Sequence, residues 1–288
     1  MMKYLLREAA GDKNSKKKKA AGAVLLVISI LILIHAWSTR SRYSPYEPGE
    51  ETKISLYGEV PGVEHYYEKE YELWEEKYSE EGLRDLFLGL PYYEAQWLNL
   101  WMKEGDEEML EQWYGDIEGT LAHVEPIKDF YRKIRENCPE TVFHGTDVGL
   151  RYDSSGVRYL KKLEERGEAD TEAYRLAEEC IEQGKIWEEE KDADYREKTL
   201  AENFIREYDQ LENDHVMGIY ADAHCDPRKN AAKGKEPCMA ARLKERCGDV
   251  VSYQAVEYMV KIESDKMLER KPAGKKERLE AGMPATEM

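Results

Sequence analysis

Ionisable side chains stand at or near the ends of three short apolar runs in this sequence. The runs, with these side chains, are ISLYGEV (54–60) with Glu59, ETVFHGTD (140–147) with His144 and Asp147, and HVMGIYADAH (215–224) with His224. A carboxylate and an imidazole suit acid–base chemistry, because histidine titrates near neutral pH and needs a partner that orients it. The sequence therefore predicts a polar site if the fold brings the run ends together.

The runs have the length and composition of buried strands. A fourth run of this kind is RDLFLGL (84–90), and each contains four to eight residues of β-branched, Leu, Tyr or Phe character. Segments with helical spacing lie between the runs: 63–81, a helix from Pro91, a helix around Phe130, 171–191 and 195–212. Alternating strands and helices predict an α/β fold with a mainly parallel sheet flanked by helices.

A parallel sheet places the carboxyl ends of its strands at one edge, where ligands bind. Glu59, Asp147 and His224 are therefore expected near one another. The helices over residues 156–213 are expected to form a subdomain over this edge.

The helix at residues 195–212 carries polar residues on its apolar face. Arg196 and Asn203 fall in helical register with the apolar residues of YREKTLAENF. Polar groups next to a core need partners, so the Arg196 guanidinium is expected to hold a ligand anion or a carboxylate such as Glu59 or Asp147. The alternative is an arginine in the first turn that reaches to solvent.

The composition bounds the class of protein. The chain has 288 residues, of which 41% are hydrophobic, and a formal net charge of −17. The first 20 residues carry seven Lys or Arg against two acids, which leaves −22 for the rest. An acidic body of this size predicts a folded domain that does not bind nucleic acid.

The N-terminal region has the features of a membrane anchor. Residues 20–37 are eighteen residues without a charge and follow Lys16–Lys19, a length that is enough to span a bilayer. Basic residues favour a cytoplasmic N-terminus, which places the main domain outside the cytoplasm. A cleaved secretory signal and a buried core helix are the alternatives.

The predicted layout has five parts. They are a basic cytoplasmic leader (1–19), a transmembrane anchor (20–37), a polar linker (38–53), an α/β domain (54–260) and a loosely ordered charged tail (261–288). The tail prediction follows from its many charges and few large apolar residues.

Three motifs in a fixed order resemble those of the erythromycin esterase family. They are YGEV near the first strand, FHGTD at the third, and YREKTLAENF followed by a strand that ends in histidine. Haem-uptake lipoproteins and Tiki-like proteases belong to the same broader superfamily, and the chain looks most like its uncharacterised membrane-anchored bacterial members. The resemblance covers residues 54–225.

The resemblance implies an α/β hydrolase in which glutamate and histidine activate water. Carried over by motif, Glu59 matches the first glutamate, Asp147 the middle aspartate, Arg196 and Glu197 the helix pair, and His224 the late histidine.

The sequence departs from the family pattern at two places. Pro61 and Gly62 stand where the first motif has its histidine, so His65 is the next imidazole along the chain. Gly89 stands where the second strand is expected to end in an acid.

Three functional hypotheses follow. The first is a cofactor-free hydrolase of an unknown small molecule, in which Glu59 or His224 activates water, Asp147 orients an imidazole and Arg196 stabilises negative charge. Its candidate substrate-binding residues are His65, His144, Glu197 and Asn203. The second is a zinc hydrolase, or one with another divalent metal, with Glu59, His144 and His224 as ligands. The third is a catalytically inactive module that binds a small ligand or a partner protein.

Overall fold

The computed structural model describes residues 45–49 and 51–270, and the side chains as far as residue 264. The predicted leader (1–19) and anchor (20–37) lie outside this part. Among the described helices, none combines the length and apolar character that a membrane span requires. The anchor therefore stays a prediction from the sequence.

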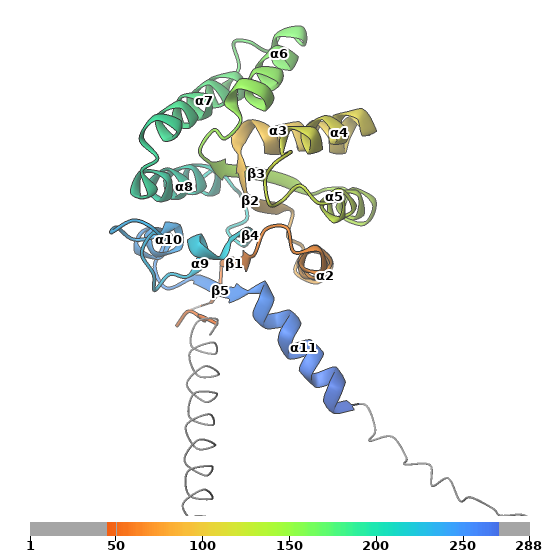
Figure 1. Cartoon of the computed structure of the whole chain (residues 1–288), viewed down its shortest axis with the longest axis vertical. Coiled ribbons are helices and arrows are strands. Elements are labelled where there is room, and N and C mark those ends of the chain that lie inside the picture. The colour runs from red at the N-terminus through yellow and green to blue at the C-terminus, as the bar shows by residue number, and fades with distance from the viewer. Residues whose placement is uncertain (1–44, 50, 271–288) are drawn as a thin grey trace, which may run out of the picture. The chain divides into compact units, whose positions relative to one another are not determined.

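Five strands form one sheet in the described chain. They are β1 (Ile54–Glu59), β2 (Asp85–Pro91), β3 (Val142–Asp147), β4 (Val216–Ala221) and β5 (Val251–Ala255). Their order is β3-β2-β4-β1-β5, and each neighbouring pair is parallel (Figure 1). The prediction of an α/β fold with a mainly parallel sheet is confirmed.

The four apolar runs became β1 to β4, whereas β5 was not predicted. The central strands β1 and β4 are buried along almost their whole length, as expected for strands covered on both faces. Strand β5 has only five residues, VSYQA, and two of them are polar. It pairs with β1 alone, at the edge of the sheet, so its sequence lacks the apolar continuity of the other strands.

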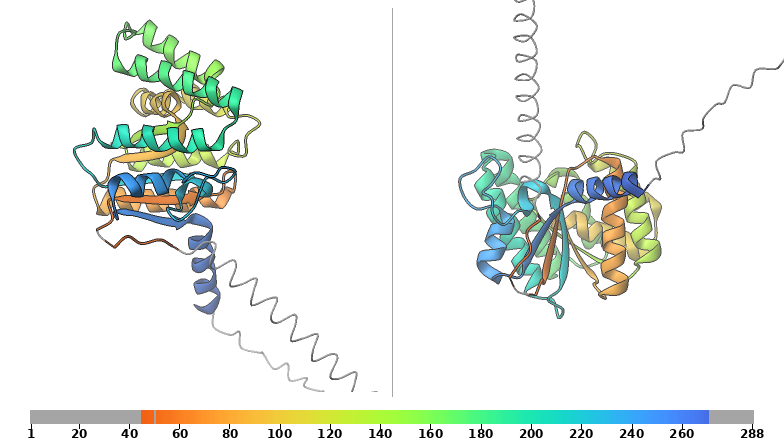
Figure 2. Two further views of the ribbon diagram at one scale, coloured as in Figure 1. Left: turned by 90° about the vertical axis from the view of Figure 1, so that its left-hand side faces the viewer. Right: turned by 90° about the horizontal axis from the view of Figure 1, so that it is seen from below.

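Helices cover both faces of the sheet. One face is covered by α2 (Glu64–Glu80) and α5 (Pro126–Asn137), and the other by α8 (Ala193–Tyr208) and α10 (Met239–Cys247) (Figure 2). Tyr131 of α5 packs edge-on against Phe143 of β3 at 5.5 Å between ring centroids. On the opposite face, Phe204 of α8 packs on Phe87 of β2 at 4.3 Å. These contacts fix α5 and α8 on opposite sides of the strands.

The aromatic stripe of α2 belongs to the core. Tyr67, Tyr71 and Trp74 are all buried, at intervals of three and four residues that place them on one face of the helix. The Trp74 indole N–H donates to Thr141 Oγ1 at 3.0 Å, which satisfies the polar end of a fully buried ring.

Helix α3 (Tyr92–Glu104) closes the sheet at β3. The Asn99 side chain accepts from Phe143 N–H at 2.8 Å and donates to Phe143 O at 2.9 Å, as a neighbouring strand would. Helix α3 approaches β3 closely because Gly145 has no side chain: a Cβ there would lie 2.4 Å from the carbonyl oxygen of Pro91.

The predicted helical subdomain is not a separate body. The other helical elements are α4 (Glu107–Asp116), the π-helix η1 (Tyr152–Gly156), α6 (Val157–Glu165), α7 (Glu172–Glu190), α9 (Asp222–Cys225) and α11 (Val256–Arg270). The described residues from Glu47 onward form one compact unit. Helix α8 is part of the cover of the sheet, because Leu200 and Phe204 on its apolar face are fully buried.

Helix α11 continues ten residues into the stretch for which the sequence predicts loose order. Val256, at its start, is fully buried. Further along, Glu263 forms an ion pair with Lys69 of α2 at 2.6 Å. These contacts with the domain give the charged sequence a surface to pack on, which composition alone does not reveal.

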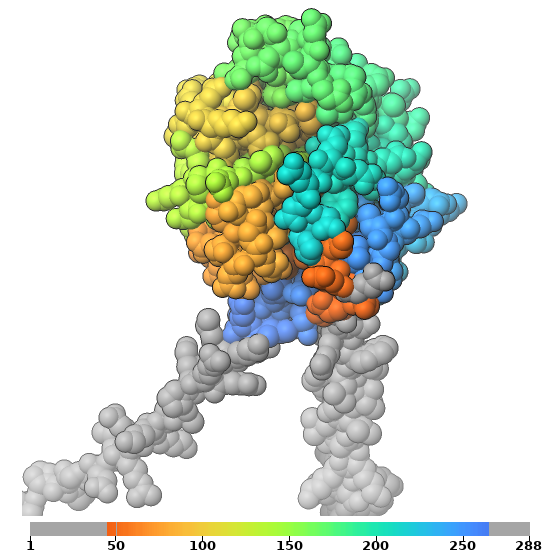
Figure 3. Space-filling view, turned by 180° about the vertical axis from the view of Figure 1, so that it is seen from behind, coloured from red at the N-terminus to blue at the C-terminus, as the bar shows by residue number. Residues whose placement is uncertain are grey.

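The strand order creates a crevice at the carboxyl edge. The connection after β2 leads to β3, and the connection after β4 leads to β5 on the opposite side. Adjacent strands whose connections diverge leave a gap between their carboxyl ends, where ligands bind. Figure 3 shows the molecule from behind, where the end of α2 and the segment before β4 lie side by side.

Candidate active site at the carboxyl edge of the sheet

A pocket of about 460 Å³ opens at this crevice. The ends of β1, β2, β3 and β4 all contribute to its wall, together with residues from α2, α4, α5, α8 and α9. Its lining includes the four predicted catalytic residues, Glu59, Asp147, Arg196 and His224. Segments up to 165 residues apart in the sequence therefore meet in one cavity.

Arg196 and Asp147 form a two-pronged ion pair in the pocket wall. Arg196 Nε donates to Asp147 Oδ1 at 2.9 Å, and Arg196 Nη2 donates to Asp147 Oδ2. Burial opposes ionisation of Asp147, but the charge of Arg196 outweighs it and holds the pKa of the carboxyl below its usual value. The interpretation of Arg196 as a solvent-exposed residue of the first turn is therefore wrong.

His224 is oriented by Glu197 and not by Asp147. The distance from His224 Nδ1 to Glu197 Oε1 is 2.7 Å, and Glu197 Oε2 accepts from the Met239 N–H at 2.7 Å. A carboxylate accepts hydrogen bonds, so Nδ1 is the donor in this contact, and in the neutral imidazole Nε2 then carries the lone pair. No described residue hydrogen-bonds Nε2.

The prediction that Asp147 orients the imidazole is corrected by this geometry. Asp147 uses its oxygens for Arg196 and for the N–H of Val148. Glu197 follows Arg196 on α8, and the two neighbouring side chains bind different residues: Arg196 binds Asp147, and Glu197 binds His224.

Two acidic side chains share the pocket on the α2 side. Burial raises the pKa of Glu59 to about 7. Glu70 of α2 is only 2% exposed, and burial together with the charge of Glu59 raises its pKa well above the usual value. Glu70 was not predicted from the sequence, although an acid on the aromatic face of α2, three residues after Tyr67, is a signal for it.

A second buried arginine–carboxylate pair lies beside the pocket. Glu94 is fully buried and accepts from Arg151 Nε and Nη2, both at 2.9 Å. Ser155 Oγ donates to the same carboxylate at 3.0 Å. Arg151 lines the pocket in a left-handed backbone conformation (φ 59°), which is strained for a residue with a side chain and is often found at functional sites.

Glu94 provides an acid after the second strand, where the family pattern expects one at the strand end. Gly89 stands where an acid was expected, but β2 continues to Pro91 and Glu94 follows in the first turn of α3. A carboxylate is thus present after β2, five residues further along the chain than expected.

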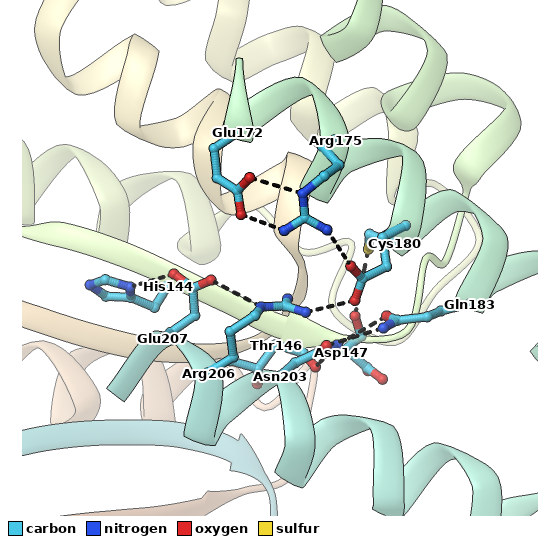
Figure 4. A network of polar contacts seen from close by, with 11 residues as sticks. His144, Thr146, Asp147, Glu172, Arg175, Cys180, Gln183, Asn203, Arg206 and Glu207 are labelled. Atoms are coloured by element: carbon cyan, nitrogen blue, oxygen red, sulfur yellow. Dashed lines mark hydrogen bonds and ion pairs between the residues drawn. The ribbon is translucent and has the colours of Figure 1, made fainter. Parts of the chain in front are cut away.

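His144 lies outside the pocket in a network of its own. Its Nε2 is 2.9 Å from Asp85 Oδ1 and its Nδ1 is 3.3 Å from Glu207 Oε2, and the ring stacks on Phe87. Figure 4 shows the contacts continuing from Glu207 through Arg206 to helix α7. Burial opposes the charged ring, but the two carboxylates outweigh it and raise the pKa of His144.

The three predicted metal ligands are therefore not brought together. Glu59 and His224 share the pocket, whereas His144 stands in mid-strand, three residues before the carboxyl end of β3 and so on the opposite face from Asp147. Within residues 45–49 and 51–270, no group of three or more His, Cys, Asp or Glu is arranged to hold a metal ion.

The remaining predicted binding residues also lie outside the cavity lining. Asn203 donates to the carbonyl of Thr146 at 3.0 Å and bonds Gln183, so it ties α8 to β3 and α7 (Figure 4). His65 is exposed in the first turn of α2, with its ring against Tyr66. Glu197 does not line the cavity and contacts His224, which does.

The fold and the site together define an α/β protein with an acid–imidazole–guanidinium pocket at the carboxyl edge of a parallel sheet. No family model matches the chain, and no curated protein matches it.

Solved structures show a likeness of fold. A Bacillus cereus protein is similar at 12% identity with a TM-score of 0.50, over 72% of this chain and 65% of that one. A succinoglycan biosynthesis protein is similar at 12% identity with a TM-score of 0.47, over 75% of this chain and 72% of that one. An erythromycin esterase mutant in its open conformation is similar at 11% identity with a TM-score of 0.47, over 71% of this chain and 69% of that one. The chain thus spans less than two thirds of the Bacillus cereus protein, and identities this low show the fold alone.

Proposed function

We propose that this protein is a hydrolase that uses His224 to activate water for the cleavage of an ester bond. One observation carries the proposal: Glu197 fixes the tautomer of His224, and His224 faces a cavity in which Nε2 has no partner among the described residues. A positioned imidazole of this kind is a general base for water at neutral pH.

The reaction balances with the residues of the pocket. Nε2 of His224 accepts a proton as the oxygen of water bonds to the ester carbonyl carbon. Arg196 keeps its Nη1 donors for the oxyanion, because Nε and Nη2 are held by Asp147. When the bond to the alcohol breaks, the imidazolium returns its proton to the departing oxygen, and a carboxylic acid and an alcohol leave.

Glu59 is the alternative base. Its pKa of about 7 makes the carboxylate a stronger proton acceptor than an ordinary glutamate. His224 is favoured because a carboxylate holds its ring in one orientation. The same assay on a Glu59→Gln variant distinguishes the two bases.

The proposal includes a location at the cell membrane. The apolar segment 20–37 after Lys16–Lys19 supports a single-pass anchor with a cytoplasmic N-terminus and an extracytoplasmic main domain. The substrate is then a small molecule that reaches the outer side of the membrane. The mechanism uses no cofactor.

A second candidate function is ligand binding without turnover. It is favoured by the first motif, where Pro61 and Gly62 replace the family histidine and His65 lies outside the cavity lining. If that histidine is needed for chemistry, the pocket retains only binding.

The test is the hydrolysis of a chromogenic ester by the full-length protein in neutral detergent. His224→Gln is expected to lower kcat by about 100-fold or more, as for the loss of a general base. His215→Gln is the matched control, because His215 precedes β4 at the opposite end of the strand. A folded wild-type protein that is inert on a panel of esters, but is stabilised by a ligand, establishes the binding function instead.

A further inference from the structure

The α2 side of the pocket is walled by aromatic rings. Tyr67, Trp113, Phe130 and Tyr131 all line the cavity, and each is at most 5% exposed. The rings contact one another: Trp113 and Tyr131 are 4.9 Å apart between centroids, Tyr131 and Phe130 5.1 Å, and Phe130 and Tyr67 6.4 Å. They form a continuous wall, and the faces of such rings attract cations.

Two carboxyl groups stand in this wall. Glu59 at the end of β1 and Glu70 of α2 both line the cavity. Glu70 Oε1 is buried and has no hydrogen-bond partner within the described part of the chain. A buried acceptor of this kind is rare in folded proteins unless a ligand or water supplies the partner.

The two arginines that line the pocket are bound to carboxylates other than Glu59 and Glu70. Arg196 is held by Asp147 and Arg151 by Glu94, each through two hydrogen bonds. Neither arginine forms an ion pair with Glu59 or Glu70. Among the residues that the structure describes, the α2 side of the pocket therefore has acceptors and aromatic rings but no cation of its own.

We infer that this side of the pocket binds a protonated amine of the ligand, with Glu70 and Glu59 as its counter-charge. An ammonium N–H donates to Glu70 Oε1, and the carbon atoms next to the nitrogen pack on the aromatic wall. The inference rests on the proposed function only in naming the substrate class, which is an ester that carries a basic nitrogen. The ester lies at His224 and the nitrogen beside α2.

The test compares two probes of the same shape. Cyclohexylamine is protonated at about pH 8 and cyclohexanol is neutral, so their difference in affinity measures the preference for charge. Binding to the full-length protein is measured by calorimetry in neutral detergent. Cyclohexylamine is expected to bind about tenfold more tightly than cyclohexanol, a difference of one charge-assisted contact.

A glutamine variant assigns the preference to Glu70. Glu70→Gln keeps the shape and removes one of the two carboxyl groups, and it is expected to reduce the preference for the amine several-fold while leaving the affinity for cyclohexanol unchanged. Glu76→Gln on the exposed side of α2 is the control and is expected to keep the preference. The wild-type comparison stands even if Glu70→Gln does not fold.

The outcomes separate this inference from the proposed function. No saturable binding of cyclohexylamine, equal binding of both probes, or an unchanged preference in Glu70→Gln overturns the amine site, whether or not a chromogenic ester is hydrolysed. Amine binding with the expected preference, in a protein that hydrolyses no ester, upholds the amine site and overturns the hydrolase proposal.

Discussion

His144 and His224 are both largely buried histidines bound to carboxylates, yet they stand in different chemical situations. His144 has a carboxylate at each ring nitrogen, Asp85 at Nε2 and Glu207 at Nδ1. His224 has Glu197 at Nδ1, and its other nitrogen belongs to a residue that lines the pocket. An imidazole with both nitrogens engaged holds elements together, whereas one with a free nitrogen is able to move a proton.

The two histidines differ in their surroundings because they lie at different positions relative to a strand. His144 lies in the middle of β3, where neighbouring elements surround the side chain. His224 lies just past the end of β4 in α9, where the chain has left the sheet and borders the crevice. The distance from the carboxyl edge therefore decides whether a histidine lies among packed elements or lines the pocket.

The largest effect is expected from Glu197→Gln. A glutamine amide no longer fixes the proton on Nδ1, so a part of the imidazole adopts the wrong tautomer and kcat falls by about 100-fold to 10,000-fold. The measurement is the pH profile of ester hydrolysis. A profile that keeps the wild-type kcat would show that Glu197 does not position His224.

The second effect is expected on stability from His144→Gln. His144 has a raised pKa in the folded state because of Asp85 and Glu207, so its stabilisation is complete below the unfolded pKa and is lost as the pH rises through the folded pKa. The variant is expected to lose about 2 kcal/mol at about pH 6 and less at about pH 9.

Urea unfolding at the two pH values measures this difference. Ester hydrolysis by the folded His144→Gln variant is expected to keep the wild-type kcat, because His144 does not line the pocket. A drop in kcat comparable with that of Glu197→Gln would contradict the assignment of a purely structural role to His144.

A smaller effect on catalysis is expected from Arg196→Lys. Lysine keeps the positive charge but cannot hold Asp147 through two parallel bonds and still present a further N–H to the oxyanion. We expect kcat to fall about tenfold with little change in KM, because the lost contact forms only in the transition state. A rise in KM at constant kcat would assign Arg196 to substrate binding.

Much of the fold was predictable because strand ends leave a local signal. Apolar runs that stop at Glu59, Asp147 and His224 predicted both the strands and their common edge. Helical register likewise predicted that Arg196 faces inward and holds a carboxylate or a ligand anion, and Asp147 was one of the two carboxylates named.

What the sequence did not reveal depends on contacts between distant elements. Glu197 and Asp147 are both plausible partners for His224, and only the placement of α9 against α8 selects Glu197. Glu70 belongs to a helix whose sequence predicts a core position, and its place in the cavity depends on how α2 packs on β4. Strand β5 is short and polar, so pairing with β1 reveals it where composition does not.

The smallest effect is expected on stability from Glu70→Gln. Glu70 contacts neither His144 nor His224. Glu70 has a raised pKa in the folded state because burial and the charge of Glu59 disfavour its ionised form. The folded protein therefore binds a proton that the unfolded chain releases above its ordinary pKa of about 4.5, so stability falls as the pH rises from there through the folded pKa. Glu70→Gln has no such cost and is expected to gain about 1 kcal/mol over the wild type at about pH 8 and little at about pH 4.

Thermal unfolding at the two pH values measures the gain, with Glu76→Gln as the exposed control on the same helix. The pH dependence distinguishes a buried carboxyl whose ionised form is disfavoured from an ordinary core position, because an ordinary replacement shifts stability equally at both pH values. Asp147 provides the opposite sign: its lowered pKa means that its pair with Arg196 stabilises the protein above the ordinary carboxyl pKa and is lost in acid. If Glu70→Gln melts below the wild type at about pH 8, Glu70 has a partner that stabilises its charge, and the cavity needs no cation from a ligand.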